Sequence, residues 1–387
     1  MEHIVYMDHA ATTPTHPEVA EVMDVWIREQ YGNPSTLYAL GGQAAQAREQ
    51  AREQVASFLN ARPDEIYFTS GGTESDNWAL KGVADAHRKK GKHLVTSSIE
   101  HHAVLDTIEF LEKRGYEVTR VPVDSTGLVD PEDVRKALRE DTILVSLMHA
   151  NNEVGTIQPI AEIGEIVKER GIIFHTDAVQ TVGKIPVDVE ELKVDLLSLS
   201  GHKIYGPKGI GALYIRKRVR VTPLLHGGGQ ERRRRAGTEN MPGILGLAKA
   251  VEIAERTLSR EAERERKMRD RLWDGLKDRI PHIALNGDLD KSLPNMLNFR
   301  VEGIEGEAMI LCLDMNRIGV SSGSACTTGS LDPSHVLLAM GIPAEEAHGS
   351  LRISLGRSNT EEDIDYFLEA FPPVVKRLRD MSPVYNK

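Results

Sequence analysis

The chain passes from an apolar run into a polar loop at Leu199-Ser200-Gly201-His202-Lys203-Ile204-Tyr205-Gly206-Pro207-Lys208-Gly209. Lys203 follows the strand-like stretch Val194–Leu199 and is surrounded by small residues. Binding and catalytic residues gather on such loops at the ends of a rigid scaffold. An amine in this position therefore indicates a chemical role rather than a solvating one.

A carboxylate ends a second run of the same kind. Asp177 closes the β-like stretch Gly171-Ile172-Ile173-Phe174-His175-Thr176-Asp177, and the carboxyl ends of parallel strands meet at one edge of a sheet. Pyridoxal phosphate requires a lysine that forms a Schiff base and an acid that keeps its pyridine nitrogen protonated. Either residue alone is typical of a surface salt bridge, but the pair favours this cofactor.

Short β-branched runs alternate with amphipathic segments through the middle of the chain, which predicts a mainly parallel α/β sheet. A charged helical segment, residues 243–279, breaks the alternation and leads into a region of mixed strands and helices. We expect a large domain at residues 15–258 and a smaller one made of residues 1–14 and 259–387. The expected strands are residues 65–69, 92–96, 142–147, 172–174, 194–199, 296–301 and 351–355, and the expected helices are residues 73–90, 102–114, 160–170, 307–315 and 361–378.

Composition narrows the class of protein. The 387 residues carry a formal net charge of -10, which argues against direct nucleic-acid binding or a membrane-surface partner. The first residues do not form a signal peptide, and no apolar run approaches the roughly 20 residues that span a bilayer. The two cysteines are too few for a disulfide framework. We therefore expect a cytoplasmic enzyme. We expect no metal site, because the sequence contains neither an HExxH nor a CxxC motif.

A phosphate seat is expected where the strand-like Ile66–Thr69 runs into Ser70-Gly71-Gly72-Thr73-Glu74-Ser75 and a helix. Helix N-termini with glycines bind phosphoryl groups, and Ser200 and His202 are candidates to complete the seat. The alternative is a glycine turn with Thr73 or Ser75 as a helix cap. Neither a dinucleotide fingerprint nor a P-loop occurs.

Two further side chains are candidates for chemistry. His101 follows a strand-like run and is a candidate to stack on the cofactor, the alternative being a loop histidine. Cys326 lies in the small-residue segment Val320–Ser330, which buries little apolar surface and is expected to be mobile with an accessible thiol. Cys312 lies in an apolar helix, where cysteines are usually buried and inert.

Taken together, these motifs resemble the cysteine desulfurases of the NifS/IscS type, a class V aminotransferase-like group of the pyridoxal-phosphate enzymes of fold type I. The resemblance runs from end to end, and it implies a mainly parallel seven-stranded sheet in the large domain and a smaller α+β domain. The matching segments are residues 8–14, 32–35, 71–75, 100–101, 151–155, 177–180, 200–203, 235–238, 321–326 and 351–354.

The resemblance implies a role for each matching residue. The roles are Lys203 as the Schiff-base lysine, Asp177 at the pyridine nitrogen, His101 on the ring and in proton transfer, Gln180 near the ring oxygen, Gly72, Thr73, Ser200 and His202 at the phosphate, Thr238 at the phosphate of the other subunit of a homodimer, Asn152 beside ring and substrate, and Arg352 on the substrate carboxylate.

The implied reaction removes sulfur from L-cysteine, releases L-alanine and leaves a persulfide on Cys326 for an iron-sulfur scaffold protein or another sulfur acceptor. The tail Met381–Tyr385 is similar to the family segment that docks the scaffold. An aminotransferase of the same fold would make keto products without Cys326, and a non-catalytic scaffold would be colourless. Selenocysteine lyase activity is a variant of the desulfurase hypothesis.

The chain departs from the family pattern at two places. Thr36-Leu37-Tyr38 stands where the family usually continues with a serine and then a histidine, which affects substrate entry rather than the reaction. In the run Arg232–Arg235, Arg233 and Arg234 are additional. The run is typical of a solvated surface that pairs with acids, with an acidic sulfur acceptor or tRNA as the alternative partner.

Overall fold

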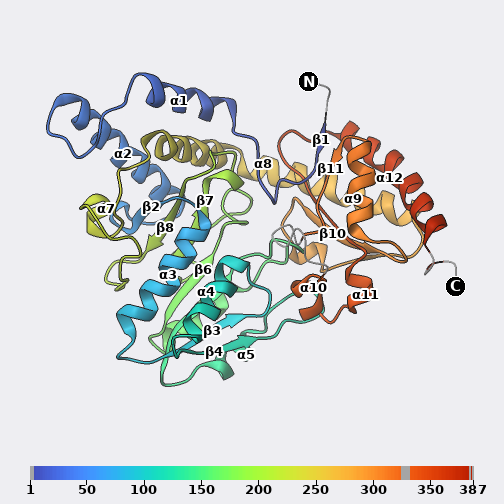
Figure 1. Cartoon of the computed structure of the whole chain (residues 1–387), viewed down its shortest axis with the longest axis horizontal. Coiled ribbons are helices and arrows are strands. Elements are labelled where there is room, and N and C mark those ends of the chain that lie inside the picture. Colours follow the sequence, from blue (N-terminus) through green and yellow to red (C-terminus); the bar gives the residue numbers. More distant parts are fainter. Residues whose placement is uncertain (1–3, 324–331, 383–384, 386–387) are drawn as a thin grey trace.

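A computed structural model of the chain describes residues 4–323, 332–382 and 385. Figure 1 shows two bodies, one on each side of the view, connected by the long helix α8 (Met241–Arg279). At 1.5 Å per residue, its 39 residues span about 58 Å. Helix α8 is therefore long enough to contribute to the cores of both bodies.

The first body is built on a seven-stranded sheet with the spatial order β2-β8-β7-β6-β5-β3-β4. Strand β8 is antiparallel to both of its neighbours, and the other pairs are parallel. The fold class expected from the sequence is confirmed. The strands are β2 (Ile66–Thr69), β3 (His93–Ser97), β4 (Glu117–Val121), β5 (Thr142–Met148), β6 (Ile173–Asp177), β7 (Leu196–Ser200) and β8 (Gly211–Ile215).

Alternation along the strands gives the sheet two apolar faces. Leu197 and Leu199 of β7 pack in one buried cluster with residues of α2, α6 and α8, whereas Leu196 packs in another with residues of α3 and α4. Successive side chains of a strand point to opposite faces, so covering both faces requires helices on both sides. The helices and 3-10 turns of this body are α1 (Pro17–Arg28), α2 (Ala39–Phe58), η1 (Pro63–Glu65), α3 (Gly72–His87), α4 (His102–Glu112), α5 (Pro131–Ala137), α6 (Ile160–Glu169), η2 (Gly201–Lys203) and α7 (Gln230–Arg233).

The second body has its own buried cluster, which takes Met268, Leu272 and Leu276 from the C-terminal half of α8 and apolar residues from the chain's two ends. It contains an antiparallel sheet of order β12-β10-β9 and a parallel pair, β1 with β11. Its elements are β1 (Val5–Tyr6), β9 (Ile283–Leu285), η3 (Leu289–Lys291), β10 (Met296–Val301), α9 (Gly306–Met315), β11 (Ile318–Gly319), α10 (His335–Ala339), α11 (Ala344–Ala347), β12 (Ser350–Ser354) and α12 (Glu361–Met381).

The expected domain boundary at residue 258 falls inside α8 and stays a prediction. Within the described ranges, no helix is both long and apolar enough to cross a bilayer.

Candidate active site

Sheet topology brings Asp177 and Lys203 together. Strands β6 and β7 are parallel neighbours, with Asp177 opposite Ser198. Asp177 is the last residue of β6, and Lys203 lies in η2, directly after β7. Both residues therefore lie at the carboxyl edge of the sheet, where open α/β sheets bind their ligands.

The amine of Lys203 contacts the segment that follows β1. Its Nζ donates hydrogen bonds to the carbonyl oxygens of Ala10 and Ala11, the latter at 2.8 Å. Gln180 Nε2 also donates to the Ala10 carbonyl, at 3.1 Å. His202 is held to the same segment by the 3.1 Å contact of its Nδ1 with Thr12 Oγ1. The N-terminal segment therefore positions three of the expected site residues.

Asp177 is a buried carboxyl with a raised pKa. Burial raises its pKa to about 6, and this rise is opposed by the hydrogen bond from the Val179 amide and by the charge of Lys203. The Val179 N–H lies 2.9 Å from Asp177 Oδ1. A cationic ring nitrogen beside this carboxyl would favour its ionised form.

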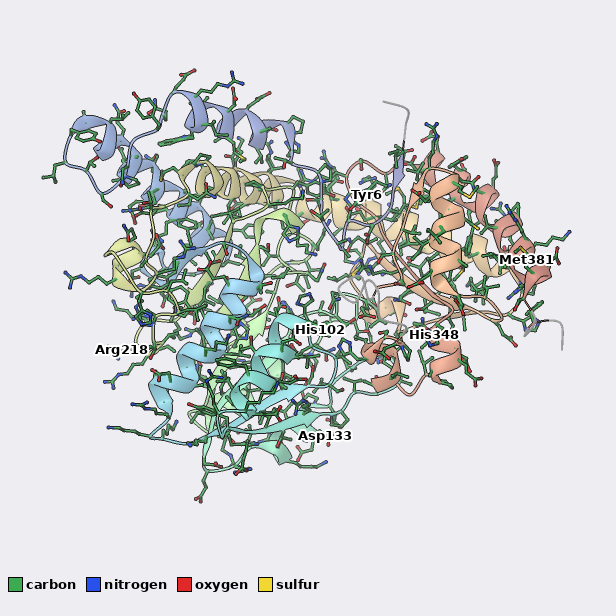
Figure 2. The ribbon with its side chains drawn as sticks, in the orientation of Figure 1. Tyr6, His102, Asp133, Arg218, His348 and Met381 are labelled. Carbon is green, nitrogen blue, oxygen red and sulfur yellow. The ribbon has the colours of Figure 1, made fainter. Side chains whose placement is uncertain are left out.

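His101 is neutral and has a defined tautomer. It is the N-cap of α4, and its Nδ1 accepts a hydrogen bond of 3.1 Å from the Ala103 amide, which leaves the ring proton on Nε2. Burial, and then the charge of Lys203, lower its pKa to about 4. The neighbouring His102 is the first residue of α4 and lies toward the middle of the molecule (Figure 2).

The N-terminus of α3 favours glycine at two positions, one because of its backbone conformation and the other because of limited space. Gly71 has a φ of +150°, which L side chains rarely adopt, and a Cβ at Gly72 would lie 2.7 Å from Val179 Cγ2. Buried Ser200 lies beside them, because a Cβ at Gly71 would stand 3.8 Å from its Oγ. Thr73 is exposed in the first turn of α3. These residues form an open seat at a helix terminus whose first N–H groups have no intrahelical acceptor.

An ion pair that the sequence did not indicate supports this seat. Glu74 accepts hydrogen bonds from Arg235 Nε and Nη2 at 2.8 and 3.0 Å, and its Oε2 also accepts from the Ser70 amide at 2.8 Å. The guanidinium offsets a carboxylate that would otherwise repel a phosphate. Thr238, three residues after Arg235, is exposed.

Arg352 reaches this region from the second body. In β12, its Nη2 pairs with Asp8 Oδ1 at 2.7 Å and its Nη1 donates to the Asn152 carbonyl at 2.7 Å. Its Nε is buried and has no hydrogen-bond partner within the described residues. A buried donor without a partner is costly. A carboxylate ligand that accepts a hydrogen bond from this Nε would relieve that cost. The ion pair with Asp8 was not expected from the sequence.

Cys326, the expected reactive thiol, lies outside the described residues. Gly323, three positions before it, directs its carbonyl oxygen to Arg352 Nη1 at 3.5 Å. The described chain therefore leads to the Cys326 segment directly from the expected carboxylate site. Cys312 is partly buried on α9 rather than fully buried as expected.

A buried polar layer that no sequence pattern predicts lies next to Asp177. His175, two residues earlier on β6, contacts the hydroxyls of Ser146 and Ser198 at 2.8 and 3.0 Å. Burial lowers its pKa to about 3. Burial and the charge of Asp177 raise the pKa of Asp76 on α3, and burial raises the pKa of Glu100 to about 8. His175 and Glu100 are therefore neutral at neutral pH.

The residues present fit pyridoxal phosphate. The glycine seat beside Ser200 and His202 suits the phosphate, Asp177 suits the ring nitrogen, and Lys203 suits the aldehyde. Val179 links the glycine seat to Asp177, because its side chain limits the space at Gly72 and its backbone N–H donates a hydrogen bond to Asp177. Within the described ranges, no group of three or more His, Cys, Asp or Glu side chains could hold a metal ion.

Comparison with known proteins agrees with this arrangement. The family model described as Aminotransferase class-V matches residues 5–367. The chain is 55% identical over 388 residues to a protein named Cysteine desulfurase IscS from Clostridium botulinum, covering 100% of this chain and 98% of that protein. Another protein of that name, from Methanosarcina thermophila, is 57% identical over 383 residues, covering 99% and 95%. A solved NifS-like protein matches with a TM-score of 0.92 at 46% identity, covering 97% of this chain and 100% of that one.

The fold and site are thus those of a pyridoxal-phosphate-dependent enzyme. The chain belongs to the aminotransferase class-V family, within its cysteine desulfurases of the NifS/IscS type. The family and the cofactor expected from the sequence are confirmed.

Proposed function

We propose that this protein is a cysteine desulfurase that removes sulfur from L-cysteine, releases L-alanine and retains the sulfur as a persulfide on Cys326. The observation that carries the proposal is the convergence of Lys203, Asp177 and His101 at one edge of the sheet. Arg352 of the second body pairs with Asp8, in the segment whose Ala10 and Ala11 carbonyls accept hydrogen bonds from Lys203. Pyridoxal phosphate, when bound, supplies the electron sink that weakens bonds at the substrate.

Each residue then has a task that its environment suits. Arg352 binds the substrate carboxylate, because its buried Nε has no hydrogen-bond partner within the described residues and the guanidinium geometry suits a carboxylate. Asn152 lies against this guanidinium and orients the substrate. Lys203 Nζ takes the proton that leaves the α-carbon. His101, which carries its ring proton on Nε2, donates a hydrogen bond from that atom to the substrate and takes part in proton transfer.

Sulfur transfer itself belongs to Cys326. Its thiolate Sγ forms a bond to the substrate sulfur, the carbon–sulfur bond of the substrate breaks, and the carbon fragment takes a proton to become alanine. The sum is one thiol and one cysteine consumed, and one persulfide and one alanine formed, with no external oxidant. A reductant or an acceptor protein then removes the outer sulfur.

The test is the mass of the protein after a brief pulse of L-cysteine. We expect about one added sulfur per chain, on the peptide that contains Cys326, because covalent catalysis stores the group on the nucleophile. Cys326→Ser should retain the cofactor spectrum but gain no sulfur. Cys312→Ser is the matched control and should gain sulfur like the unmodified chain. Equal sulfur release by Cys326→Ser and by the unmodified chain would exclude Cys326 as the acceptor.

The proposal includes a homodimer in which Thr238 completes the partner's phosphate seat. Supporting it, the segment between α1 and α2 carries exposed apolar side chains, among them Leu37 at 104% and Tyr38 at 61% exposure. Arg48 of α2 forms an ion pair with Glu239, so Thr238 lies next to the helix that follows this segment. Exposed apolar groups of this kind mark interaction surfaces.

The remaining parts of the proposal concern the acceptor and the compartment. An iron-sulfur scaffold protein, or another sulfur acceptor, takes the persulfide sulfur, and a cytoplasmic location suits a thiol that must stay reduced. Loading the chain with isotopically labelled cysteine and then adding a purified scaffold protein tests the transfer. Label that stays on Cys326 in the presence of the scaffold would count against that acceptor.

A further inference from the structure

A basic cavity lies away from the site described above. It has a volume of about 500 Å³ and is lined by residues of α1, of the middle of α8 and of the loop after β12, including Arg256, Arg260 and Arg357. Ligand pockets typically have volumes of this order. Figure 1 shows α1 running alongside α8, the helix that connects the two bodies.

The carboxylates of the cavity already have cationic partners. Glu18 pairs with Arg256 and, at 3.3 Å, with Lys249. Glu261 pairs with Arg260 at 3.2 Å and with Arg264 at 3.0 Å. Each glutamate is therefore shared between two cations.

Arg357 adds a cation with no carboxylate of its own. Among the described residues, no acidic group lies within ion-pair distance of its guanidinium, whose Nη2 donates to Thr257 Oγ1 at 2.6 Å. The guanidinium also lies 5.0 Å from the centre of the Tyr205 ring. Burial lowers the pKa of Arg357, and the more distant charges of Glu261 and Glu265 oppose this shift only in part. The cavity collects positive charge in a chain whose net charge is -10.

His16 supplies a neutral donor to the same cavity. Its Nδ1 accepts from the Glu18 amide at 3.3 Å, which leaves the ring proton on Nε2. Three guanidinium groups and a ring N–H around one opening match the oxygens of a phosphate, which guanidinium groups bind in a bidentate manner. The cavity is larger than a single phosphate ion needs, so it also has room for the organic part of a phosphomonoester.

We propose that this cavity is a binding site for the phosphate group of a small phosphorylated molecule, held by Arg357, Arg260 and His16. The ligand would bridge segments that belong to both bodies, because Ile253 of α8 packs in the first buried cluster and Arg357 follows β12 of the second body.

The cavity is also connected to the Lys203 segment. The backbone N–H of His16 donates to the Tyr205 carbonyl at 2.9 Å, and that of Arg357 donates to the Tyr205 hydroxyl at 2.7 Å. Tyr205 stands two residues after Lys203. Occupancy of the cavity therefore acts on the loop that carries the site lysine, while the ligand itself stays apart from the α3 seat.

Calorimetric titration of the pyridoxal-phosphate-loaded protein tests the proposal. The bound cofactor keeps the α3 seat filled, and the buffer contains neither phosphate nor sulfate. Orthophosphate and glycerol 3-phosphate are titrated separately, and at least one should bind saturably with one site per chain. Tighter binding of glycerol 3-phosphate would show that the cavity also recognises the organic part, and equal binding would show that the phosphate group suffices. No saturable binding of either probe overturns the proposal.

Variants locate the binding. Arg357→Gln and Arg260→Gln should each weaken it at least about tenfold, as expected for loss of a charged donor. Because the Arg260 side chain is 76% exposed, Arg260→Gln should leave the fold intact even if Arg357→Gln does not. Arg135→Gln, on α5, is the matched control and should bind like the unmodified protein. Unchanged binding in Arg260→Gln and Arg357→Gln means an adventitious ion only and overturns the assignment. The titration contains no free L-cysteine, so its result is independent of the desulfurase reaction.

Discussion

Burial sets the protonation of the residues around Lys203. Asp177 has its pKa raised to about 6 and His101 has its pKa lowered to about 4, in both cases mainly because burial disfavours the charged form. At neutral pH the site therefore offers a carboxylate and a neutral imidazole, as the proposed roles require. Below about pH 6, Asp177 takes up a proton and loses the charge that attracts a ring N–H.

The loss of the Asp177 charge at low pH predicts how cofactor affinity depends on pH. Only ionised Asp177 pairs with the protonated ring, so the affinity advantage of the unmodified chain over Asp177→Asn should be large near pH 8. It should shrink about tenfold for each pH unit below 6, as the ionised fraction falls. Cofactor titrations between about pH 5 and pH 8 measure the ratio. A ratio that is constant over this range would contradict the assignment, and use of the ratio cancels the titration of the cofactor's own groups.

At this scale Lys203, Asp177 and His101 could be singled out from the sequence because each stands at or shortly after the end of a strand-like run, and their roles stay predictions. The sequence did not allow the prediction of the ion pair of Asp8 with Arg352, whose members are 344 positions apart. The buried Asp76 and Glu100 were also missed. Acidic side chains carry no sequence signal that they will be buried with raised pKa values, since burial depends on the packing of elements that are distant in the chain.

At the scale of elements, the carboxyl edge of the sheet is set by strand alternation and by the start of α3. The expected strands agree with β2, β3, β5, β6 and β7 to within a few residues at each end, because buried parallel strands read as continuous apolar runs. Strand β4 was missed because it lies at the sheet edge, where only one of its five residues is fully buried. Strand β8 was missed because no helix precedes it.

The start of α3 yields a prediction with a matched control. Gly72→Ala would place a Cβ 2.7 Å from Val179 Cγ2, so Val179 or the first turn of α3 must shift. Overpacking of this kind costs roughly 1–3 kcal/mol, and we expect pyridoxal phosphate to bind about tenfold more weakly. Gly42→Ala in α2 meets nothing within 4 Å and should bind the cofactor normally. Equal affinities of the two variants would show that the α3 seat does not need the space at Gly72.

At the scale of the whole molecule, two buried clusters share α8, and exposed apolar side chains precede α2. The sequence predicted both regions but not their contact through Arg352, because a contact between distant segments leaves no local pattern. The proposed dimer would cover the apolar segment and bring Thr238 to a second site.

The dimer makes a prediction about mass in solution. The unmodified chain should scatter light as a dimer, and Leu37→Asp should dissociate it more readily, because a charge in an apolar interface is costly. Leu311→Asp is the control, since Leu311 is also exposed, at 67%, but lies on α9. A monomer at micromolar concentration, or equal loss of dimer in both variants, would be inconsistent with this interface.

The central claim is that Lys203, placed by β7 at the edge shared with Asp177, makes the chain a desulfurase of L-cysteine. Its most direct test measures alanine and sulfide formed from L-cysteine and a reductant, with pyridoxal phosphate supplied, for the unmodified chain and for Lys203→Ala. We predict equal amounts of alanine and sulfide from the unmodified chain and a loss of at least about a thousandfold in Lys203→Ala, as expected when a covalent nucleophile is removed. Undiminished alanine formation by Lys203→Ala, or none by the unmodified chain, would contradict the claim.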